Sequence, residues 1–321
     1  MKDPKERKVM MEHSVSVVPI GCKFGAITAY VYYIDAPEPA LVDTGVSSSP
    51  EEIEAALAFR GVRMTDLRWI LLTHAHLDHH GGAWGVWEKT ERRAKVVVSR
   101  TDAPVLRDRR RYIDYYYGLQ GKYFRPKDHA EHIRGIIRNI GGDVEPALVV
   151  SDGDRISLGE GVSVSVLETP GHSDGSVSYV LDGHNWVFTG DAVQLHGATN
   201  GIPIIEDTVL HRRSLRRLLE SVKPDRLYLG HSYLNAKGEP VLPTLEGEAA
   251  LKALRDSLEA DAWLQDAVKR HLSGGQQSVF DEKYREYLAI AQEIGYTRDP
   301  TVYPCAFLVT MDAYKKEQLS V

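Results

Sequence analysis

The chain has 321 residues, 43% of them apolar and 26% charged, which suits one large globular domain or a domain with an extension. Its formal net charge of −6 disfavours a main partner that is nucleic acid or an anionic membrane, because such partners select a net basic face. The two cysteines, Cys22 and Cys305, stand far apart and exclude a disulfide framework or a cysteine-based zinc site.

The N-terminus is strongly charged over residues 1–8 and leads into no apolar segment of signal-peptide length. Nowhere does an apolar run reach the roughly 18 residues that a membrane-spanning helix needs. The sequence therefore predicts a cytoplasmic protein without a membrane partner.

Short apolar or alternating runs fill residues 14–42 and are separated by glycines and a proline-rich turn, a pattern that predicts antiparallel hairpins. A helix is expected next, with Ser49 as its cap, Pro50 in its first turn and Glu52 completing a capping box. Gly61 is expected to end this helix.

Apolar runs predict further strands at 67–72 and 95–99. The stretch 101–146 lacks this succession of apolar runs and contains clusters of arginine and tyrosine, and we interpret it as a helical insert. The hairpin pattern then returns, with strands predicted at 147–150, 162–167, 177–181 and 186–188.

A helix at 207–222 and a strand at 226–229 follow, so the second half roughly repeats the order of elements in the first. Beyond Pro243 the apolar spacing becomes helical over 245–272 and 281–294, with Ser273-Gly274-Gly275 between the two. We predict a domain over residues 14–235, including the insert, and a helical C-terminal extension over 243–321.

A dense group of potential metal ligands follows the strand at 67–72. The string directly after it holds His74, His76, Asp78 and His79 within six residues. Imidazoles and a carboxylate fixed on one turn suit zinc and related divalent ions. The sequence therefore predicts a metal site at the end of this strand.

Three later positions, His172, Asp191 and His231, each follow a predicted strand and each offer one more ligand. A glycine occurs just before every one of them, and glycine lets the backbone turn sharply where a side chain must reach a shared cleft. Asp43 also follows a strand, in the string Leu41-Val42-Asp43-Thr44-Gly45.

The intact HxHxDH string and the ordered later positions resemble the five motifs of the metallo-β-lactamase superfamily over about residues 14–235. The resemblance implies an α/β (α+β) fold, a four-layer αββα sandwich of two similar halves with a dinuclear metal site where the sheets meet. The helical C-terminal extension would be added to this sandwich.

The resemblance also implies a role for each matching residue. One metal would be bound by His74, His76 and His172, and the other by Asp78, His79 and His231. Asp191 would bridge the two metals. Asp43 would hold the histidine loop by hydrogen bonds rather than bind metal.

All seven ligand positions are filled, so we expect two divalent metal ions. Zinc is the first choice for this donor set, which also suits iron or manganese. Two such ions hold a shared hydroxide at neutral pH. That hydroxide would attack a scissile carbonyl while Asp78 orients it and moves its proton to the leaving group.

The remaining histidines match no motif. His80 follows the ligands where a helix is expected to begin, and we interpret it as a packing or capping residue. We interpret the others as surface or core residues, namely His13, His129, His132, His184, His196, His211 and His271.

The ligand set does not choose the substrate, because members of the resembled superfamily cleave thioesters, lactones, β-lactams, phosphodiesters and sulfate esters. The insert carries a mixed group of cations and aromatics, which includes Arg109, Arg110, Arg111, Tyr115 and Tyr116. One interpretation is a solvated helix with tyrosines on the core. The other is a lid that binds an anionic substrate such as a coenzyme A or glutathione thioester.

The C-terminal helices are expected either to roof the active site or to form the interface of a homo-oligomer. We favour a hydrolase of thioesters or related small acyl esters over a β-lactamase, since no export signal is seen. A lactonase is the close alternative, and the acidic charge disfavours a phosphodiesterase that acts on RNA. An alternative of another class is a metal-binding effector that acts through protein contacts.

Overall fold

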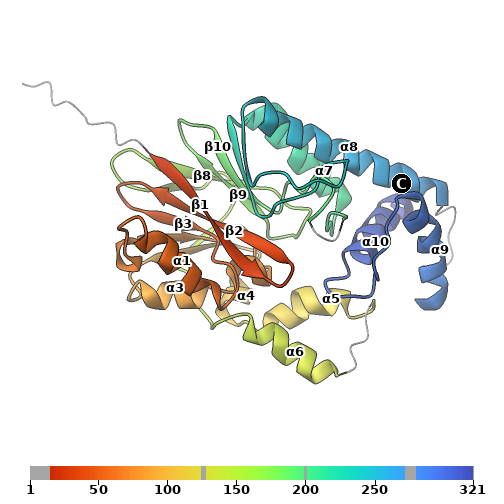
Figure 1. Ribbon diagram of the computed structural model, residues 1–321, viewed down its shortest axis with the longest axis horizontal. Helices are drawn as coiled ribbons and strands as arrows, with labels where there is room; N and C mark the ends of the chain where they lie inside the picture. The colour runs from red at the N-terminus through yellow and green to blue at the C-terminus, as the bar shows by residue number, and fades with distance from the viewer. Residues whose placement is uncertain (1–14, 124–127, 199–200, 272–279, 321) are drawn as a thin grey trace, which may run out of the picture.

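The computed structural model describes residues 15–123, 128–198, 201–271 and 280–320 (Figure 1). The charged N-terminus, His13 and the expected break at 273–275 lie outside this part of the chain. Two six-stranded sheets lie face to face, and helices cover the outer face of each. The predicted four-layer αββα arrangement is confirmed. No helix in the described ranges is long and apolar enough to cross a membrane.

The first sheet starts with antiparallel strands and continues with parallel ones. Its spatial order follows the chain: β1 (Ser16–Phe24), β2 (Ile27–Asp35), β3 (Ala40–Val42), β4 (Trp69–Leu71), β5 (Lys95–Ser99) and β6 (Leu148–Val150).

The second sheet is antiparallel except for the parallel pair β10 and β11. Its spatial order also follows the chain: β7 (Arg155–Ser157), β8 (Ser163–Glu168), β9 (Val177–Leu181), β10 (Trp186–Gly190), β11 (Arg226–Leu229) and β12 (Thr244–Glu246).

The alternation of side chains along β2 shows how the first sheet is buried on both faces. Tyr32 and Ile34 belong to the core between the two sheets. Val31 and Tyr33 belong to the core beneath the helices of the first sheet. Burying each such side chain stabilises the folded state by about 1.5–3 kcal/mol relative to leaving it exposed to water. The register is therefore strongly fixed, because a slip of one residue would exchange the two faces.

Helices cover each sheet. The first sheet carries α1 (Ser49–Ala58), the short turns η1 (Met64–Asp66) and α2 (Leu77–His80), and α3 (Ala83–Lys89). The second sheet carries α7 (Thr208–Arg216), which continues as the π-helical turn η3 (Arg217–Val222), and the long helix α8 (Glu248–His271).

The start of α1 differs from the prediction. Pro50 lies in the first turn as expected, but Ser49 does not cap the helix. Its hydroxyl accepts a hydrogen bond from the amide of Val46 at 3.0 Å. Glu52 does not complete a capping box, because its carboxylate accepts from the amide of Lys23 in β1 at 3.2 Å. Both polar groups therefore connect the helix to neighbouring segments.

The C-terminal helix was predicted to begin at Leu245, but residues 244–246 form β12. Leu245 lies opposite Leu227 of β11, so pairing along the strand edge outweighs the helical spacing of the apolar residues. Helix α8 begins only after Gly247, whose φ of +52° suits glycine.

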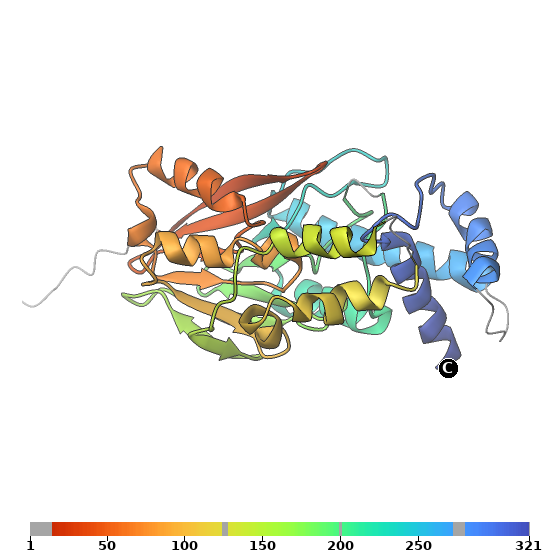
Figure 2. The same cartoon turned by 90° about the horizontal axis from the view of Figure 1, so that it is seen from below.

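Helices from two distant segments lie side by side at one end of the sandwich (Figure 2). Residues 101–146 contain α4 (Ala103–Arg107), the π-helical turn η2 (Ile113–Tyr117), α5 (Gly118–Gln120) and α6 (His129–Arg138). The C-terminal segment adds α9 (Phe280–Glu293) and α10 (Ala306–Leu319). One apolar cluster joins buried tyrosines of the insert, such as Tyr112 and Tyr116, to Phe307 of α10 and to Leu77. Leu77 belongs to the string from His74 to His79 that holds four of the predicted ligands, which we call the metal loop.

The carboxylate of Asp312 in α10 joins these two helical segments. It accepts hydrogen bonds from the hydroxyls of Tyr123 in the insert and Tyr287 in α9, and it pairs with Lys122 at 2.8 Å. Burial opposes the charged form, but these partners outweigh it and hold the pKa of Asp312 below its usual value. Asp312 therefore links the insert and the C-terminal helices by polar contacts within an otherwise apolar interface.

Replacing Asp312 should weaken the protein measurably. Asp312→Ala leaves two tyrosine hydroxyls without their acceptor, so the free energy of unfolding should fall by about 1–3 kcal/mol in chemical denaturation. Because the folded pKa is depressed, the charge stabilises the fold above the unfolded pKa near 3.9, and this stability is lost as the pH falls through the lower folded value.

The deficit of Asp312→Asn should therefore shrink below about pH 4. Asp256→Asn, which removes the partner of exposed Lys252, is the control and should change stability little. An equal deficit of Asp312→Asn at neutral and acid pH would contradict the role of the charge.

Candidate metal centre

The predicted ligands come from four loops that follow strands and meet at one edge of the sandwich. His74 and His76 lie in the loop after β4, and Asp78 and His79 lie in the short helix α2 that follows it. The other three follow later strands: His172 follows β8, Asp191 follows β10 and His231 follows β11. Positions 152 residues apart in sequence are thus brought into one cluster, as the His79 and His231 Nε2 atoms at 3.3 Å show.

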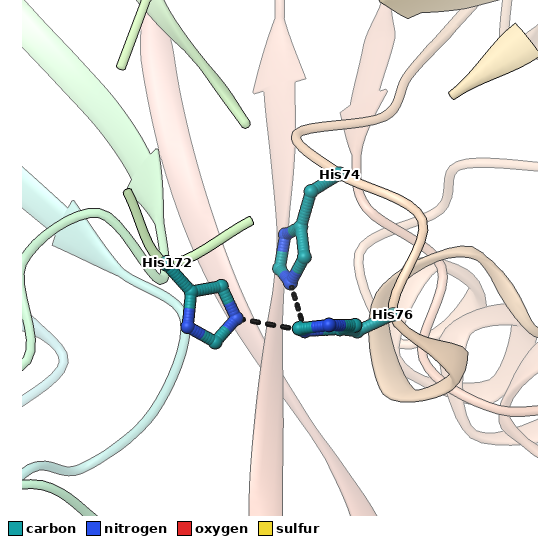
Figure 3. A group of neighbouring side chains, drawn as sticks. All are labelled: His74, His76 and His172. Carbon is teal, nitrogen blue, oxygen red and sulfur yellow. Dashed lines mark hydrogen bonds between the residues drawn. The ribbon is translucent and has the colours of Figure 1, made fainter. Parts of the chain in front are cut away.

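Three histidines form the first group (Figure 3). Nε2 of His74 lies 3.2 Å from Nδ1 of His76, which lies 2.7 Å from Nε2 of His172. Burial is the main reason that the pKa values of all three imidazoles lie below the ordinary value. Neutral imidazoles have a lone pair free for a metal ion, so this group is suited to hold one.

The second group contains Asp78, His79 and His231, and Asp191 lies between the two groups. Oδ1 of Asp191 is 3.3 Å from Nε2 of His79. Oδ2 of Asp191 is 3.4 Å from Nε2 of His172 and 3.6 Å from Nε2 of His231. The carboxylate therefore faces both groups at once.

The buried polar atoms fit a bound cation. Oδ1 of Asp191 is buried and accepts no hydrogen bond within the described residues. Such an acceptor is costly to bury unless a cation compensates it. The donor set of imidazole nitrogens and carboxylate oxygens is the one that divalent zinc and related ions prefer.

Hydrogen bonds on the far side of each ring select its tautomer. Nδ1 of His172 donates to the carbonyl of Ile204 and Nδ1 of His231 to that of Thr28, both at 2.8 Å. Nδ1 of His79 donates to the carboxylate of Asp43 at 2.9 Å. In the neutral form of each ring these bonds favour the proton on Nδ1, so that the Nε2 lone pair faces the cluster.

Asp43 holds the metal loop in shape. Its carboxylate accepts from the amide of Thr73 at 2.8 Å and from the Thr73 hydroxyl, in addition to its bond with His79. Asp43 has a φ of +60°, a conformation that aspartate and asparagine tolerate better than most residues. The structure thus places Asp43 behind the ligands rather than among them.

At two of the positions before a ligand, neighbouring atoms lie so close to the backbone that only glycine fits. A Cβ atom at Gly230 would lie 2.2 Å from Oδ1 of Asp191. At Gly190, with a φ of +48°, it would lie 2.4 Å from the hydroxyl of Thr73. A side chain at either position would collide with the site, which explains why these glycines precede Asp191 and His231.

Opposite charges dominate the second group. Burial alone would lower the pKa of His231, but the carboxylates of Asp191 and Asp78 outweigh it and raise this pKa to about 10. Burial would raise the pKa of Asp191, but His231 and His79 outweigh it and hold that pKa well below its usual value. Protons and metal ions therefore compete for the same carboxylates and imidazoles.

His80 lies outside the cluster, as the sequence indicated. Its Nδ1 donates to the carbonyl of His76 at 3.0 Å. Its ring stacks on Tyr112 with centroids 6.0 Å apart. His80 is buried and packs the metal loop against the insert.

The five predicted substrate residues occupy different environments. Arg109 donates to the carbonyls of Ile140 and Gly141 at 2.7 and 3.1 Å, so its guanidinium supports the insert. Tyr116 is buried, with its ring centroid 4.6 Å from that of His76. The remaining three, Arg110, Arg111 and Tyr115, are exposed. Their role in binding substrate stays a prediction.

Two acidic residues near the ligands were missed by the sequence reasoning. Asp102 accepts from the amide of Ala75 at 2.8 Å and from the hydroxyl of Tyr116 at 2.6 Å, so it ties the metal loop to the insert. Its position just after β5 was a signal, because neighbouring strands end at the same edge.

Glu206 is the second missed residue, and it lies in a loop that has no motif. Its Oε1 is 3.9 Å from Nε2 of His76. Burial, followed by repulsion from Asp174 and Asp102, raises the pKa of Glu206 to about 8.

A four-layer sandwich with a histidine and aspartate cluster where its sheets meet defines a class of metal-binding hydrolases. Residues 23–231 match the family model of the metallo-beta-lactamase superfamily. The chain belongs to the metallo-β-lactamase superfamily and is a hydrolase of that superfamily.

Similar proteins of known name agree with this assignment. A hydroxyacylglutathione hydrolase of Rhodopseudomonas palustris (strain BisA53) is 30% identical over 280 residues, which cover 76% of this chain and 89% of the relative. A protein of the same name from Brucella ovis is 29% identical over 223 residues, which cover 70% of this chain and 69% of the relative.

Solved structures share the fold. A metallo-β-lactamase family protein of Thermus thermophilus superposes with a TM-score of 0.69 at 20% identity and covers 95% of this chain and 93% of its own. A β-lactamase from Chitinophaga pinensis superposes with a TM-score of 0.51 at 22% identity, over 75% of this chain and 87% of its own.

Asp43→Asn tests the tautomer argument. The new amide can accept from the Thr73 amide with its oxygen, but its NH₂ group would donate to Nδ1 of His79. The proton of His79 would then move to Nε2, which faces the cluster and could no longer bind metal. Metal affinity should fall by about 10–100-fold.

A competition titration of zinc against a chromogenic chelator measures this affinity. Asp35→Asn, an exposed position at the end of β2, is the matched control and should bind zinc like the unmodified protein. Unchanged affinity of Asp43→Asn would show that the His79 tautomer is set by something other than Asp43.

Proposed function

We propose that the protein is a two-metal hydrolase that cleaves small acyl substrates, with thioesters as the main class. The observation that carries the proposal is the carboxylate of Asp191, whose oxygens lie within 3.6 Å of histidines from both groups of ligands. A carboxylate in this position suits a bridge between two cations. The second support is the resemblance to hydroxyacylglutathione hydrolases at about 30% identity.

The residues present match the ligands that such a pair of ions needs. His74, His76 and His172 would hold one ion, and Asp78, His79 and His231 the other, with Asp191 shared. When bound, two divalent ions supply a hydroxide nucleophile at neutral pH and polarise the scissile carbonyl. Zinc is the proposed metal because the donor set contains five imidazoles, and iron or manganese are the alternatives.

Asp78 is proposed to move the proton. Its Oδ2 lies 3.3 Å from Nε2 of His231, and 17% of its side chain is exposed, so it is open to the substrate side of the cluster. Burial opposes ionisation, but His79 and His231 outweigh it and hold the pKa of Asp78 well below its usual value. An ionised carboxylate can accept a proton from the nucleophile and pass it to the leaving thiolate.

The first test combines metal analysis of the purified protein with a hydrolysis screen. We expect about two metal ions per chain and selective turnover of acyl-coenzyme A or hydroxyacylglutathione over lactone, β-lactam and bis-nitrophenyl phosphate substrates. If the protein binds two metals but prefers a lactone or a phosphodiester, the two-metal site is supported and the proposed thioester substrate is rejected. Metal binding without turnover of any ester would favour an effector that acts through protein contacts.

Asp78→Ala tests the mechanism. It removes a ligand of the second group and the proposed proton carrier, so kcat on the preferred substrate should fall by about 10²–10⁴-fold. Metal analysis should show the loss of one ion per chain while circular dichroism stays unchanged. Asp35→Ala serves as the surface control. A kcat within about threefold of the unmodified protein would reject this role of Asp78.

A further inference from the structure

The loop of residues 201–207 lies outside every helix and strand, and its Ile204 carbonyl orients a predicted metal ligand. Nδ1 of His172 donates to this carbonyl at 2.8 Å. The loop also binds the backbone beside the ligand, because the amide of Glu206 donates to the carbonyl of Gly171 at 2.8 Å. The position of the His172 ring therefore depends on what holds this loop in place.

Gln194, which is buried, holds the peptide group of Ile204 directly. Its side-chain oxygen accepts from the Ile204 amide at 3.0 Å, and its NH₂ group donates to the Ile204 carbonyl at 2.8 Å. A backbone amide can only donate, so the Gln194 atom that faces it is the oxygen. The Gln194 nitrogen and His172 Nδ1 lie 3.1 Å apart and share the two lone pairs of one carbonyl. Gln194 and His172 are thus anchored on the same residue of the loop.

Thr310 of α10 holds the same loop from the C-terminal extension. Its hydroxyl donates to the carbonyl of Pro203 at 2.8 Å and accepts from the amide of Ile205 at 3.0 Å. Both bonds are buried, and these two backbone groups flank Ile204 in a segment that has no strand partner. Loss of the hydroxyl would leave a buried donor and a buried acceptor unpaired, which favours movement of the loop.

Thr310 differs in its partner from other polar residues of α10. Glu317 accepts from the hydroxyl of Thr208 in α7 at 2.7 Å. Tyr314 donates to the carboxylate of Asp261 in α8 at 2.8 Å. Those contacts attach the helix to other helices, whereas Thr310 binds the backbone on both sides of the carbonyl that orients the ligand.

We infer that Thr310 is a positioning residue for the metal ligand His172, so that the C-terminal extension takes part in building the first group. Thr310 acts through Pro203, Ile205 and the Ile204 carbonyl between them, and it is not itself a ligand. Because coupling between two sites is reciprocal, metal binding by the first group should in turn stabilise the docking of α10. The inference rests on the metal binding of the proposed function and needs neither the thioester nor the second ion.

Thr310→Val tests the inference, because it keeps the shape of the side chain and removes its hydroxyl. The affinity for zinc, measured by competition with a chromogenic chelator, should fall about tenfold, the lower end of the loss expected when a group behind a metal ligand is removed. Thr310→Ser retains the hydroxyl and should restore most of the affinity.

Thr208→Val is the matched control. It also removes a buried threonine hydroxyl that attaches α10, but the partner of this hydroxyl is Glu317 rather than the backbone of residues 203–205. The free energy of unfolding should fall much as it does in Thr310→Val, while the zinc affinity stays unchanged. The pair of variants therefore separates a general loosening of α10 from an effect on the ligand.

Amide hydrogen exchange tests the reverse direction in the unmodified protein, and it decides the inference even if Thr310→Val does not fold. Zinc should slow exchange in α10 and at Ile205, whose amide donates to Thr310, by a larger factor than in α1 on the first sheet. Helix α1 reports the general stabilisation that any bound ligand gives. Where Thr310→Val folds, the factor for α10 should fall to that for α1.

Unchanged zinc affinity in Thr310→Val would overturn the inference. So would an equal loss in Thr208→Val, a loss that Thr310→Ser does not restore, or an equal slowing of α10 and α1 by zinc. If the unmodified protein binds no zinc, iron or manganese, the proposed function fails and the inference fails with it. Metal binding that does not depend on Thr310 rejects the inference alone and leaves the proposed function standing.

Discussion

A carboxylate buried among imidazoles is the constraint on which the rest of the site depends. Asp191 has little contact with solvent, and its charge is tolerated only because positive or polarisable partners surround it. Gly230, which precedes His231, leaves room for Oδ1 of Asp191, where a Cβ atom would collide. The surrounding sheets are buried on both faces, and they hold the four ligand loops at a fixed separation.

The insert packs directly against this cluster, and the C-terminal helices pack against the insert. Tyr116 packs on His76, and its hydroxyl is held by Asp102, which also binds the amide of Ala75 in the metal loop. The C-terminal helix α10 packs against the insert through an apolar cluster and through the hydrogen bonds that Asp312 accepts. The chemistry of the cluster and the shape of its surroundings are thus built by different parts of the chain, which meet at a few side chains.

The sequence could predict which side chains meet in the cluster because each follows a strand end, and the strand ends of a layered fold meet at one edge. The four-layer arrangement was implied by the resemblance to the superfamily, and the half-repeat of hairpins, helix and strand agreed with it. Local pattern did not predict β7 and β12, because each has a single apolar residue and owes its strand structure to the neighbour with which it pairs. Nor could it predict that Ser49 and Arg109 bind backbone groups, or that Glu206 approaches His76, because these contacts join distant loops.

The orientation of the ligand rings depends largely on backbone atoms. His172 and His231 donate to the carbonyls of Ile204 and Thr28, and a carbonyl is present whatever side chain its residue carries. The helical segments, in contrast, attach through individual side chains such as Asp102 and Asp312. The orientation of the cluster's rings is thus less exposed to substitution than the attachment of the helices around it.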